Sequence, residues 1–421
     1  MTAPQTSELW KSLISGKIEE AMNFFQAKLN DDPADRSNWV GLIAGFCALG
    51  QINQVVGIIT KRHEAFHDGP LVVMEAMAGL ASKHQIKILE FLANNWPKSR
   101  PDYVFCLYYH AHLLLDRDMA STAHPIFLEC KKYFLTHGDA LEVNANSELY
   151  SLYRHCVNLV ESAQLQELLT TDKDHVDRYV GPVEWLDPAD EHNPCVGFVA
   201  ADRYYAETFG PDFLKALNLY WPAGNAFHLH IVDIPKSDQP ALLAIMREHA
   251  GSVDLRISLS ERPDGLLLEK SAYYASMRFF LICRLIERYQ ACIITFDIDM
   301  IAEKNLEPIL AASLKANYSR YRRNNYGPGG HDYAALTAFS GPSGVDMAKL
   351  VERIIIERME ESPKDLWFVD QTALFQAWQL YSELDVADYQ AANFSDSSPE
   401  LEYFFDHLSA KEIKLRLSRL K

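Results

Sequence analysis

The feature that most constrains this chain is an apolar run that ends in two aspartates, from Ala291 to Asp299. The run Cys-Ile-Ile-Thr-Phe is short and rich in β-branched residues, which is typical of a buried strand. Asp297 and Asp299 follow two positions apart, and side chains at this spacing on an extended strand point the same way. Both carboxylates can therefore converge on one cation. The pattern predicts a site for a metal-bound diphosphate where this strand ends.

The spacing alone is weak evidence, because this acidic chain repeats it at Asp116 to Asp118 and at Asp172 to Asp174. Only the pair at 297 and 299 follows a strand-like run inside an alternation of helices and strands. In such folds ligands gather at the carboxyl ends of strands. Two like charges also repel each other unless a cation lies between them. The alternative is that both aspartates only end the strand and cap the following turn.

Composition limits the classes of function. The 421 residues are too many for one ordinary core, and the formal charge of -17, from 57 acidic and 40 basic residues, excludes nucleic acid as a partner. The seven cysteines include no C-x-x-C pair, which indicates a reducing compartment. The amino-terminal residues lack a signal-peptide pattern, and the longest apolar stretch, Tyr103 to Leu115, is too short to span a membrane. We expect a soluble, cytoplasmic protein with no transmembrane segment.

Residues 1–171 have helical apolar spacing, and we expect an all-α tetratricopeptide-like solenoid there. Gly16 and Gly50 lie 34 residues apart, which is the length of one such repeat. The first helix of a repeat fits Trp39, Leu42 and Phe46, and the second helix and exit of the preceding repeat fit Ala21, Phe25 and Pro33. From Leu71 onward the repeats are degenerate helical hairpins.

An aspartate- and proline-rich stretch, residues 172–193, is typical of a linker, and residues 194–421 have the pattern of an α/β domain with parallel strands. A basic loop is expected from Tyr318 to Asp332 and a basic amphipathic helix from Lys411 to Lys421. The remaining expected strands are Val196 to Ala201, Phe227 to Val232, Asp254 to Leu259 and Ala334 to Phe339, and the expected helices are Tyr205 to Tyr220, Lys270 to Tyr289, Val345 to Met359 and Trp367 to Leu380.

Three segments of this second half resemble the GT-A (Rossmann-like) class of nucleotide-sugar-dependent glycosyltransferases. The first is the opening strand and turn, Val196 to Tyr205; the second is Tyr273 to Arg278 with the metal-binding triplet Asp297 to Asp299; the third is Trp367 to Leu374 with its Asp-Gln pair. The resemblance covers about half of the chain, from Pro194 to His407. It implies a metal-dependent hexosyltransferase that uses a nucleotide-sugar donor, commonly a UDP-sugar.

The resemblance also implies roles for single residues. Asp299 would bind Mn²⁺ or Mg²⁺ directly, with Asp297 and His407 as further ligands, and Asp370 would contact sugar hydroxyls or act as the catalytic base. Arg278 suits a bidentate contact to phosphate, Asp202 suits the ribose or base, and Tyr204 can stack on uracil. Ala200, Arg203, Gly341 and Gln371 complete the expected donor-binding set.

Other interpretations stay open at this point. Arg278 can form a surface salt bridge, and Asp202 and Asp370 can be helix N-caps. The same strand and aspartates suit a haloacid-dehalogenase-like phosphatase, although Ile301 stands where that motif expects Thr or Val. A non-catalytic scaffold that binds a nucleotide-sugar is a third possibility. We expect the helical region to select the acceptor, a protein or a glycan, although a spacer or dimerisation role is an equal alternative.

Overall fold

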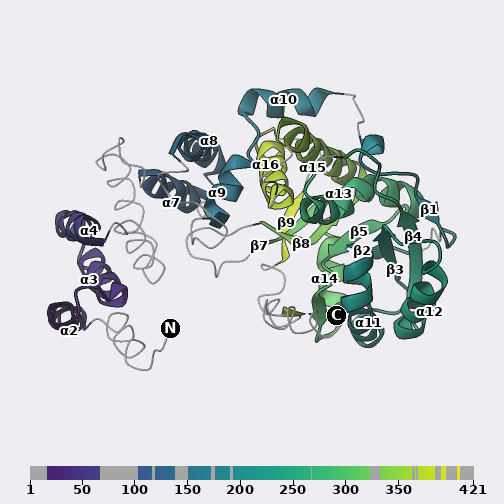
Figure 1. Ribbon diagram of the computed structural model, residues 1–421, viewed down its shortest axis with the longest axis horizontal. Coiled ribbons are helices and arrows are strands. Elements are labelled where there is room, and N and C mark those ends of the chain that lie inside the picture. The colour runs from purple at the N-terminus through teal and green to yellow at the C-terminus, as the bar shows by residue number, and fades with distance from the viewer. Residues whose placement is uncertain are drawn as a thin grey trace. The chain divides into compact units, whose positions relative to one another are not determined.

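The computed structural model describes residues 17–66, 103–115, 119–137, 150–171, 176–189, 193–266, 268–322, 332–362, 366, 368–384, 390–394 and 405–407 (Figure 1). The chain forms two compact units, and the first changes to the second between Val157 and Asn158. Each unit is described by itself below.

The first unit is helical throughout its described residues. Consecutive helices pack against each other within it: α2 against α3, α3 against α4, α7 against α8, and α8 against α9. A Cβ added to Gly41 would lie 2.4 Å from the ring of Phe25, so this glycine lets α3 approach α2 closely. The bounds are α2 Ile18–Asp31, α3 Arg36–Ala48, α4 Ile52–Phe66, α7 Tyr103–Leu115, α8 Ala120–His137 and α9 Tyr150–Val157.

Ala21 and Phe25 lie on α2 and are buried, and Trp39 and Leu42 lie on α3 and are buried, while Phe46 on α3 is half-buried. Pro33 lies between α2 and α3, and its carbonyl accepts a hydrogen bond from the Trp39 indole at 2.8 Å. Much of the stretch that follows Leu71, residues 71–100 and 138–149, lies outside the described residues. The tetratricopeptide repeat itself therefore stays a prediction.

The second unit is built on a mixed sheet of eight strands in the order β1-β4-β3-β2-β5-β8-β7-β9. The central strands β4, β3, β2 and β5 run parallel, but β8 pairs antiparallel with both β5 and β7. The expectation of parallel strands is therefore correct for the centre and wrong for β8. The bounds are β1 Glu184–Trp185, β2 Cys195–Asp202, β3 Ala226–Val232, β4 Asp254–Ser260, β5 Cys292–Phe296, β7 Tyr318–Arg322, β8 Asp332–Phe339 and β9 Ala391–Asn393; a separate pair is formed by β6 Met300–Ala302 and β10 Phe405–His407.

Helices cover both faces of this sheet (Figure 1). Side chains of α13, α15 and α16 form the core on one face, and side chains of α11, α12 and α14 form the core on the other. Every residue of β3 and β5 is buried, as expected for strands covered on both faces. The bounds are α10 Ser162–Thr170, η2 Val176–Arg178, α11 Arg203–Tyr220, α12 Gln239–Ala250, α13 Lys270–Tyr289, α14 Glu307–Ser313, α15 Gly341–Glu361 and α16 Val369–Glu383.

The boundary between the units differs from the expected linker at residues 172–193. Val160 exchanges two buried hydrogen bonds with the side chain of Gln376, at 2.9 and 2.8 Å, so α10 already belongs to the α/β unit. Val176, Tyr179 and Val180 are buried in the core on the α13 face. The aspartates and prolines of this stretch suggested a solvated linker, whereas apolar residues among them anchor it.

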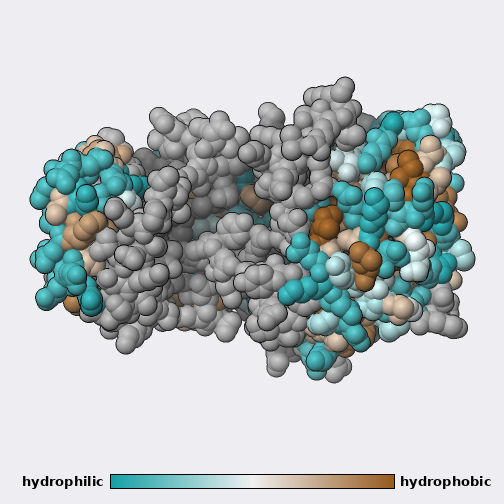
Figure 2. Space-filling model, turned by 90° about the horizontal axis from the view of Figure 1, so that it is seen from below, coloured by the Kyte–Doolittle hydropathy of each residue, from teal (hydrophilic) through white to brown (hydrophobic). Residues whose placement is uncertain are grey.

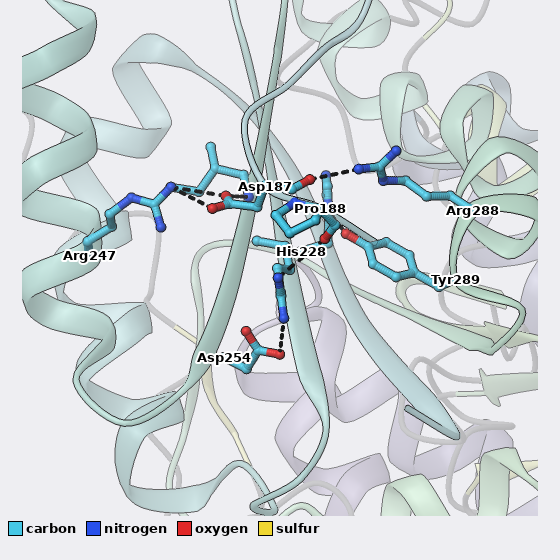
Figure 3. A network of polar contacts seen from close by, with 9 residues as sticks. Asp187, Pro188, His228, Arg247, Asp254, Arg288 and Tyr289 are labelled. Carbon is cyan, nitrogen blue, oxygen red and sulfur yellow. Dashed lines mark hydrogen bonds and ion pairs between the residues drawn. The ribbon is translucent and has the colours of Figure 1, made fainter. Parts of the chain in front are cut away.

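Residues 184–188 form an edge strap that closes the exposed side of β4 (Figure 3). The carboxylate of Asp187 accepts bonds from Arg247 at 2.9 and 3.0 Å and from the backbone N–H of Ile257 at 2.8 Å. Arg288 donates to the carbonyl of Asp187 at 2.7 Å and stacks 4.4 Å from the ring of Trp185. The strap thereby satisfies backbone groups that an open sheet edge would expose.

Two basic segments of the sequence are described only in part. Tyr318–Arg322 is strand β7 rather than the start of a loop, while residues 323–331 and the expected helix from Lys411 to Lys421 lie outside the described residues. No helix within the described ranges is long and apolar enough to cross a membrane. On the face drawn in Figure 2, the hydrophobic side chains of the described residues lie in small groups among hydrophilic ones.

Candidate functional site

The carboxyl ends of the parallel strands bring four aspartates to one edge of the sheet, which we call the carboxylate edge. Asp202 ends β2, Asp233 follows β3, and Asp297 and Asp299 follow β5. Asp202 and Asp233 are close enough for the charge of Asp233 to help raise the pKa of Asp202, although burial raises it more. The predicted gathering of Asp202, Asp297 and Asp299 at one edge is what parallel strands produce.

A buried arginine joins two of the predicted residues. Arg278, on α13, donates through Nη1 to Oδ1 of Asp297, and its Nη2 lies 3.6 Å from Oδ2 of Asp370 on α16. Its Nε donates to the carbonyl of Ala275 at 3.0 Å. Arg278 and Asp370 are 8% and 7% exposed, so the alternative of a surface salt bridge is wrong. The guanidinium fixes two carboxylates rather than presenting an open fork to phosphate.

Asp299 is left without an ion pair among the described residues. Burial raises the pKa of its carboxyl to about 6, the charge of Asp297 raises it further, and a backbone N–H and Arg278 oppose the change. The ionised form of Asp299 is therefore disfavoured in the folded protein without a cation. A divalent cation bound to this carboxylate would remove the penalty, so the oxygen ligands present fit the implied Mn²⁺ or Mg²⁺.

His407 is brought to the same place by strand pairing. It lies in β10, directly opposite Met300 in the antiparallel register with β6, and Met300 is the residue after Asp299. This register places the backbone of His407 beside that of Met300, next to Asp299, and the role of His407 as a ligand stays a proposal. Within the described part of the chain, no group of three or more His, Cys, Asp or Glu side chains lies close enough to hold a metal ion.

Asp370 stands at the first turn of α16. Burial raises the pKa of its carboxyl, while Arg278 and the backbone N–H of Gln371 lower it. That N–H donates to Oδ1 of Asp370 at 2.8 Å, and Phe368, two residues before Asp370, has a left-handed φ of 69°. Such a backbone conformation is costly for a bulky residue and persists where the surroundings hold it. The Asp370 carboxyl is thus held firmly at the edge, beside Arg278.

The turn after β2 positions the other donor-site candidates. Asp202 caps α11 by accepting from the backbone N–H of Tyr205 at 2.8 Å, so the N-cap interpretation is confirmed. Arg203 forms ion pairs with Glu207 and Asp238, at 2.7 and 2.6 Å, and does not pair with the aspartates of the carboxylate edge. Tyr204 is 41% exposed on the first turn of the helix, and Ala200 is half-buried two residues before Asp202, on the same face of β2.

Gly341 is not part of this site. It opens α15 with a φ of 64° and follows β8, whose last residue, Phe339, pairs with Ile293 near the start of β5. Because β8 runs antiparallel to β5, Gly341 lies at the opposite edge of the sheet from Asp297. The expected role of Gly341 in binding the donor is therefore wrong on this geometry.

Three residues near the carboxylate edge, Tyr205, Asp233 and Tyr274, were not predicted from the sequence. Burial raises the pKa of the Tyr205 phenol, and the charges of Asp299, Asp202 and Asp297 raise it further, so these three carboxylates act on it electrostatically. Tyr274 donates to Oδ2 of Asp233 at 2.7 Å, and Asp233 has a left-handed φ of 62°. For Asp233 the signal was present, since an aspartate follows the strand Phe227 to Val232, as Asp202 ends β2 and Asp297 follows β5.

No protein-family model and no curated protein matches the chain. Solved structures with some likeness are the apo WbbM bifunctional glycosyltransferase (14% identity, TM-score 0.33, covering 50% of this chain and 40% of that chain) and the galactosyltransferase LgtC with donor and acceptor sugar analogues (14%, 0.30, 42% and 70%). An active-site mutant of LgtC has 18% identity and a TM-score of 0.31, and the match covers 47% of this chain and 72% of that chain. The chain thus spans less than half of the WbbM chain. These TM-scores are too low to support conclusions about this chain.

Proposed function

We propose that the α/β unit is a metal-dependent glycosyltransferase that uses a nucleotide-sugar, with a UDP-sugar as the expected donor. The observation that carries the proposal is Asp299: a half-buried carboxylate without an ion pair among the described residues, beside Asp297 at the carboxyl end of β5. Among common ligands, a divalent cation with a diphosphate is the group that such a pair suits best. Mn²⁺ or Mg²⁺, when bound, would supply charge neutralisation for the leaving diphosphate.

The residues of the carboxylate edge have different roles in this proposal. Asp299 and Asp297 serve as metal ligands, with His407 as the third, and Arg278 holds Asp297 in a fixed orientation. Asp370, whose pKa burial raises, contacts a sugar hydroxyl or accepts the proton of the acceptor. Asp202 and Tyr204 lie at the end of β2, where the nucleoside is expected, and Gln371 lies next to Asp370.

A direct test is to incubate the protein with UDP-sugars and Mn²⁺ and to measure the products. We expect slow release of UDP that accelerates when an acceptor is supplied and stops with a chelator. A haloacid-dehalogenase-like phosphatase would instead release inorganic phosphate from phosphomonoesters and form an aspartyl adduct at Asp297. Detection of that adduct by mass spectrometry would refute the transferase proposal. A non-catalytic scaffold would bind the donor without any release.

We further propose that the helical unit selects the acceptor, a protein or a glycan. A fragment of residues 158–421 keeps α10 and η2, which pack in the α/β core, and is suited to a test of this role. We expect it to retain metal-dependent hydrolysis of the donor but to lose most transfer to the acceptor. Transfer by this fragment at the rate of the full chain would show that the helices serve assembly or stability instead.

A further inference from the structure

A continuous row of hydrogen bonds runs along the face of β3 and β4 that α13 covers. Tyr289 Oη lies 2.7 Å from His228 Nδ1, and His228 Nε2 lies 2.7 Å from Ser258 Oγ. Ser258 Oγ lies 2.8 Å from His230 Nδ1, and His230 Nε2 lies 2.9 Å from Ser260 Oγ. All five side chains are buried. We call these residues the histidine–serine row; Figure 3 shows its start at Tyr289 and His228.

Both imidazoles of the row are neutral. Burial lowers the pKa of His230 to about 3, with a smaller contribution from Arg284, and burial lowers the pKa of His228 well below its usual value. A neutral imidazole has one donor and one acceptor nitrogen, and a serine hydroxyl has one proton. The Ser258 hydroxyl is fully buried, and the two histidines are its only side-chain hydrogen-bond partners among the described residues, so it donates its proton to one of them and accepts from the other. The four bonds then all point the same way. The row has only two hydrogen-bonded states, one directed toward Ser260 and one directed toward Tyr289.

The surroundings of Tyr289 select one direction. Arg288 and Arg256 flank its phenol, and the edge strap holds both of them through the carbonyls of Asp187 and Pro188, at 2.7 and 3.2 Å. Guanidinium groups only donate, so they favour a phenol oxygen that accepts from them and donates its own proton to His228. Burial raises the pKa of this phenol, and both arginines oppose the rise, so the phenol keeps its proton and can donate it. The row is therefore directed from Tyr289 to Ser260.

This direction leaves the hydroxyl proton of Ser260 to be donated elsewhere. Ser260 is 6% exposed, and the described residues supply no acceptor for that proton. Ser260 ends β4 level with Asp202 on β2, because both residues pair with Val232 of β3, which lies between them. Strands lie about 4.8 Å apart, so Ser260 is about 14 Å from β5, which leads to the metal carboxylates.

We propose that the Ser260 hydroxyl donates a hydrogen bond to a carbonyl oxygen of the donor's nucleobase, which makes Ser260 a specificity-determining residue. The proposal rests on the proposed function, which places the diphosphate at Asp299. Ser260 is too far from Asp299 to reach that diphosphate, whereas the ribose and base extend from it along the carboxylate edge past Asp202. A nucleobase carbonyl oxygen is a pure acceptor, so it suits a hydroxyl whose proton has to be donated.

The direction of the row can be tested without any ligand. In protein labelled with ¹⁵N-histidine, NMR should find the Nε2–H tautomer at both His228 and His230, with His228→Gln and His230→Gln used to assign the signals. Tyr289→Phe removes the phenol that sets the direction and should let Nδ1–H tautomers form. An Nδ1–H tautomer at either histidine of the unmodified protein would overturn the assigned direction, whatever the enzyme does.

The contact to the nucleobase is tested by titration calorimetry with UDP and with inorganic pyrophosphate, each with Mn²⁺. Ser260→Ala should weaken binding of UDP about fivefold to tenfold and leave binding of pyrophosphate unchanged, since a neutral hydrogen bond is lost. Ser260→Thr keeps the hydroxyl and should bind UDP as the unmodified protein does. Ser260→Cys, a weak donor, gives a second test if Ser260→Ala does not fold.

The outcomes separate this inference from the proposed function. If the unmodified protein binds UDP and Ser260→Ala binds it equally well, or loses pyrophosphate to the same extent, the nucleobase contact is refuted while the transferase proposal stands. If the unmodified protein binds neither UDP nor pyrophosphate with Mn²⁺, the donor site fails and the nucleobase contact fails with it. The tautomer measurement then still decides the direction of the row.

Discussion

Replacing Asp299 by asparagine is expected to abolish Mn²⁺-dependent binding of nucleotide and transfer, and to make the metal-free protein more stable. The variant loses a negatively charged ligand but keeps the side-chain volume. In the folded protein the pKa of Asp299 is about 6, against about 3.9 for an unfolded aspartate. The folded state therefore carries a disfavoured charge at pH 7 that asparagine does not carry.

The sign of the pH dependence follows from this difference. Between pH 4 and pH 6, approximately, the folded protein binds more protons than the unfolded chain, so the free energy of unfolding falls as pH rises through this window. We expect the asparagine variant to escape this fall and to exceed the unmodified protein by about 2 kcal/mol at pH 7, with no difference near pH 4. Urea unfolding at both pH values, without metal, measures the effect.

Asp264→Asn is a matched control, because Asp264 is an exposed aspartate on the loop after β4. It should change neither nucleotide binding nor the pH profile of stability. Saturating Mn²⁺ with UDP should reverse the order at pH 7, since it stabilises only the protein that binds it. An Asp299→Asn variant that still binds UDP in a chelator-sensitive way would show that the metal site lies elsewhere.

The strand and its two aspartates were predictable because local pattern determines them. An apolar run of β-branched residues indicates a buried strand, and the spacing of Asp297 and Asp299 follows from the extended backbone. The capping role of Asp202 was equally local. These features need no knowledge of which segments pair in space.

The features that could not be predicted depend on contacts between distant segments. The direction of β8 places Gly341 at the far edge of the sheet, and no local pattern states whether a strand runs parallel or antiparallel to its neighbour. The partners of Arg278 lie on β5 and α16, so its role in holding two carboxylates could not be inferred from its helix alone. The histidine–serine row likewise needs the register of β3 with β4.

The linker shows a different kind of error, in which a signal was present but outweighed. Aspartates and prolines suggested a solvated stretch at residues 172–193, yet Val176, Tyr179 and Val180 lie among them and are buried. Apolar residues that recur in a polar stretch indicate anchoring to a core. Giving them weight would have placed the boundary nearer Val157.

Replacing Arg278 by alanine is expected to lower the free energy of unfolding by about 3–5 kcal/mol, which is the usual cost of breaking a buried ion pair by removing one partner. Asp370 is 7% exposed and would lose the guanidinium of Arg278 that lies beside it. Asp297 would then lie near Asp299 without a positive charge to balance the two carboxylates. Urea unfolding at pH 7 measures the loss. Arg278→Lys keeps the charge but cannot fork between two carboxylates, so its cost should be intermediate.

Arg284 offers a control on the same helix. It pairs with Asp177, whose side chain is 86% exposed, so Arg284→Ala should cost less than about 1 kcal/mol. The double variant Arg278→Met with Asp370→Asn also removes one of the two carboxylate charges that lose their partner. Much of the lost stability should return, because the cost comes from a carboxylate left buried without a partner rather than from the missing guanidinium. Two outcomes would contradict this role: Arg278→Ala lowers the free energy of unfolding no more than Arg284→Ala does, or the double variant is no more stable than Arg278→Ala. Either would show that Arg278 does not hold the two carboxylates in solution. The fixed placement of Asp297 and Asp370, on which the proposed chemistry depends, would then be lost.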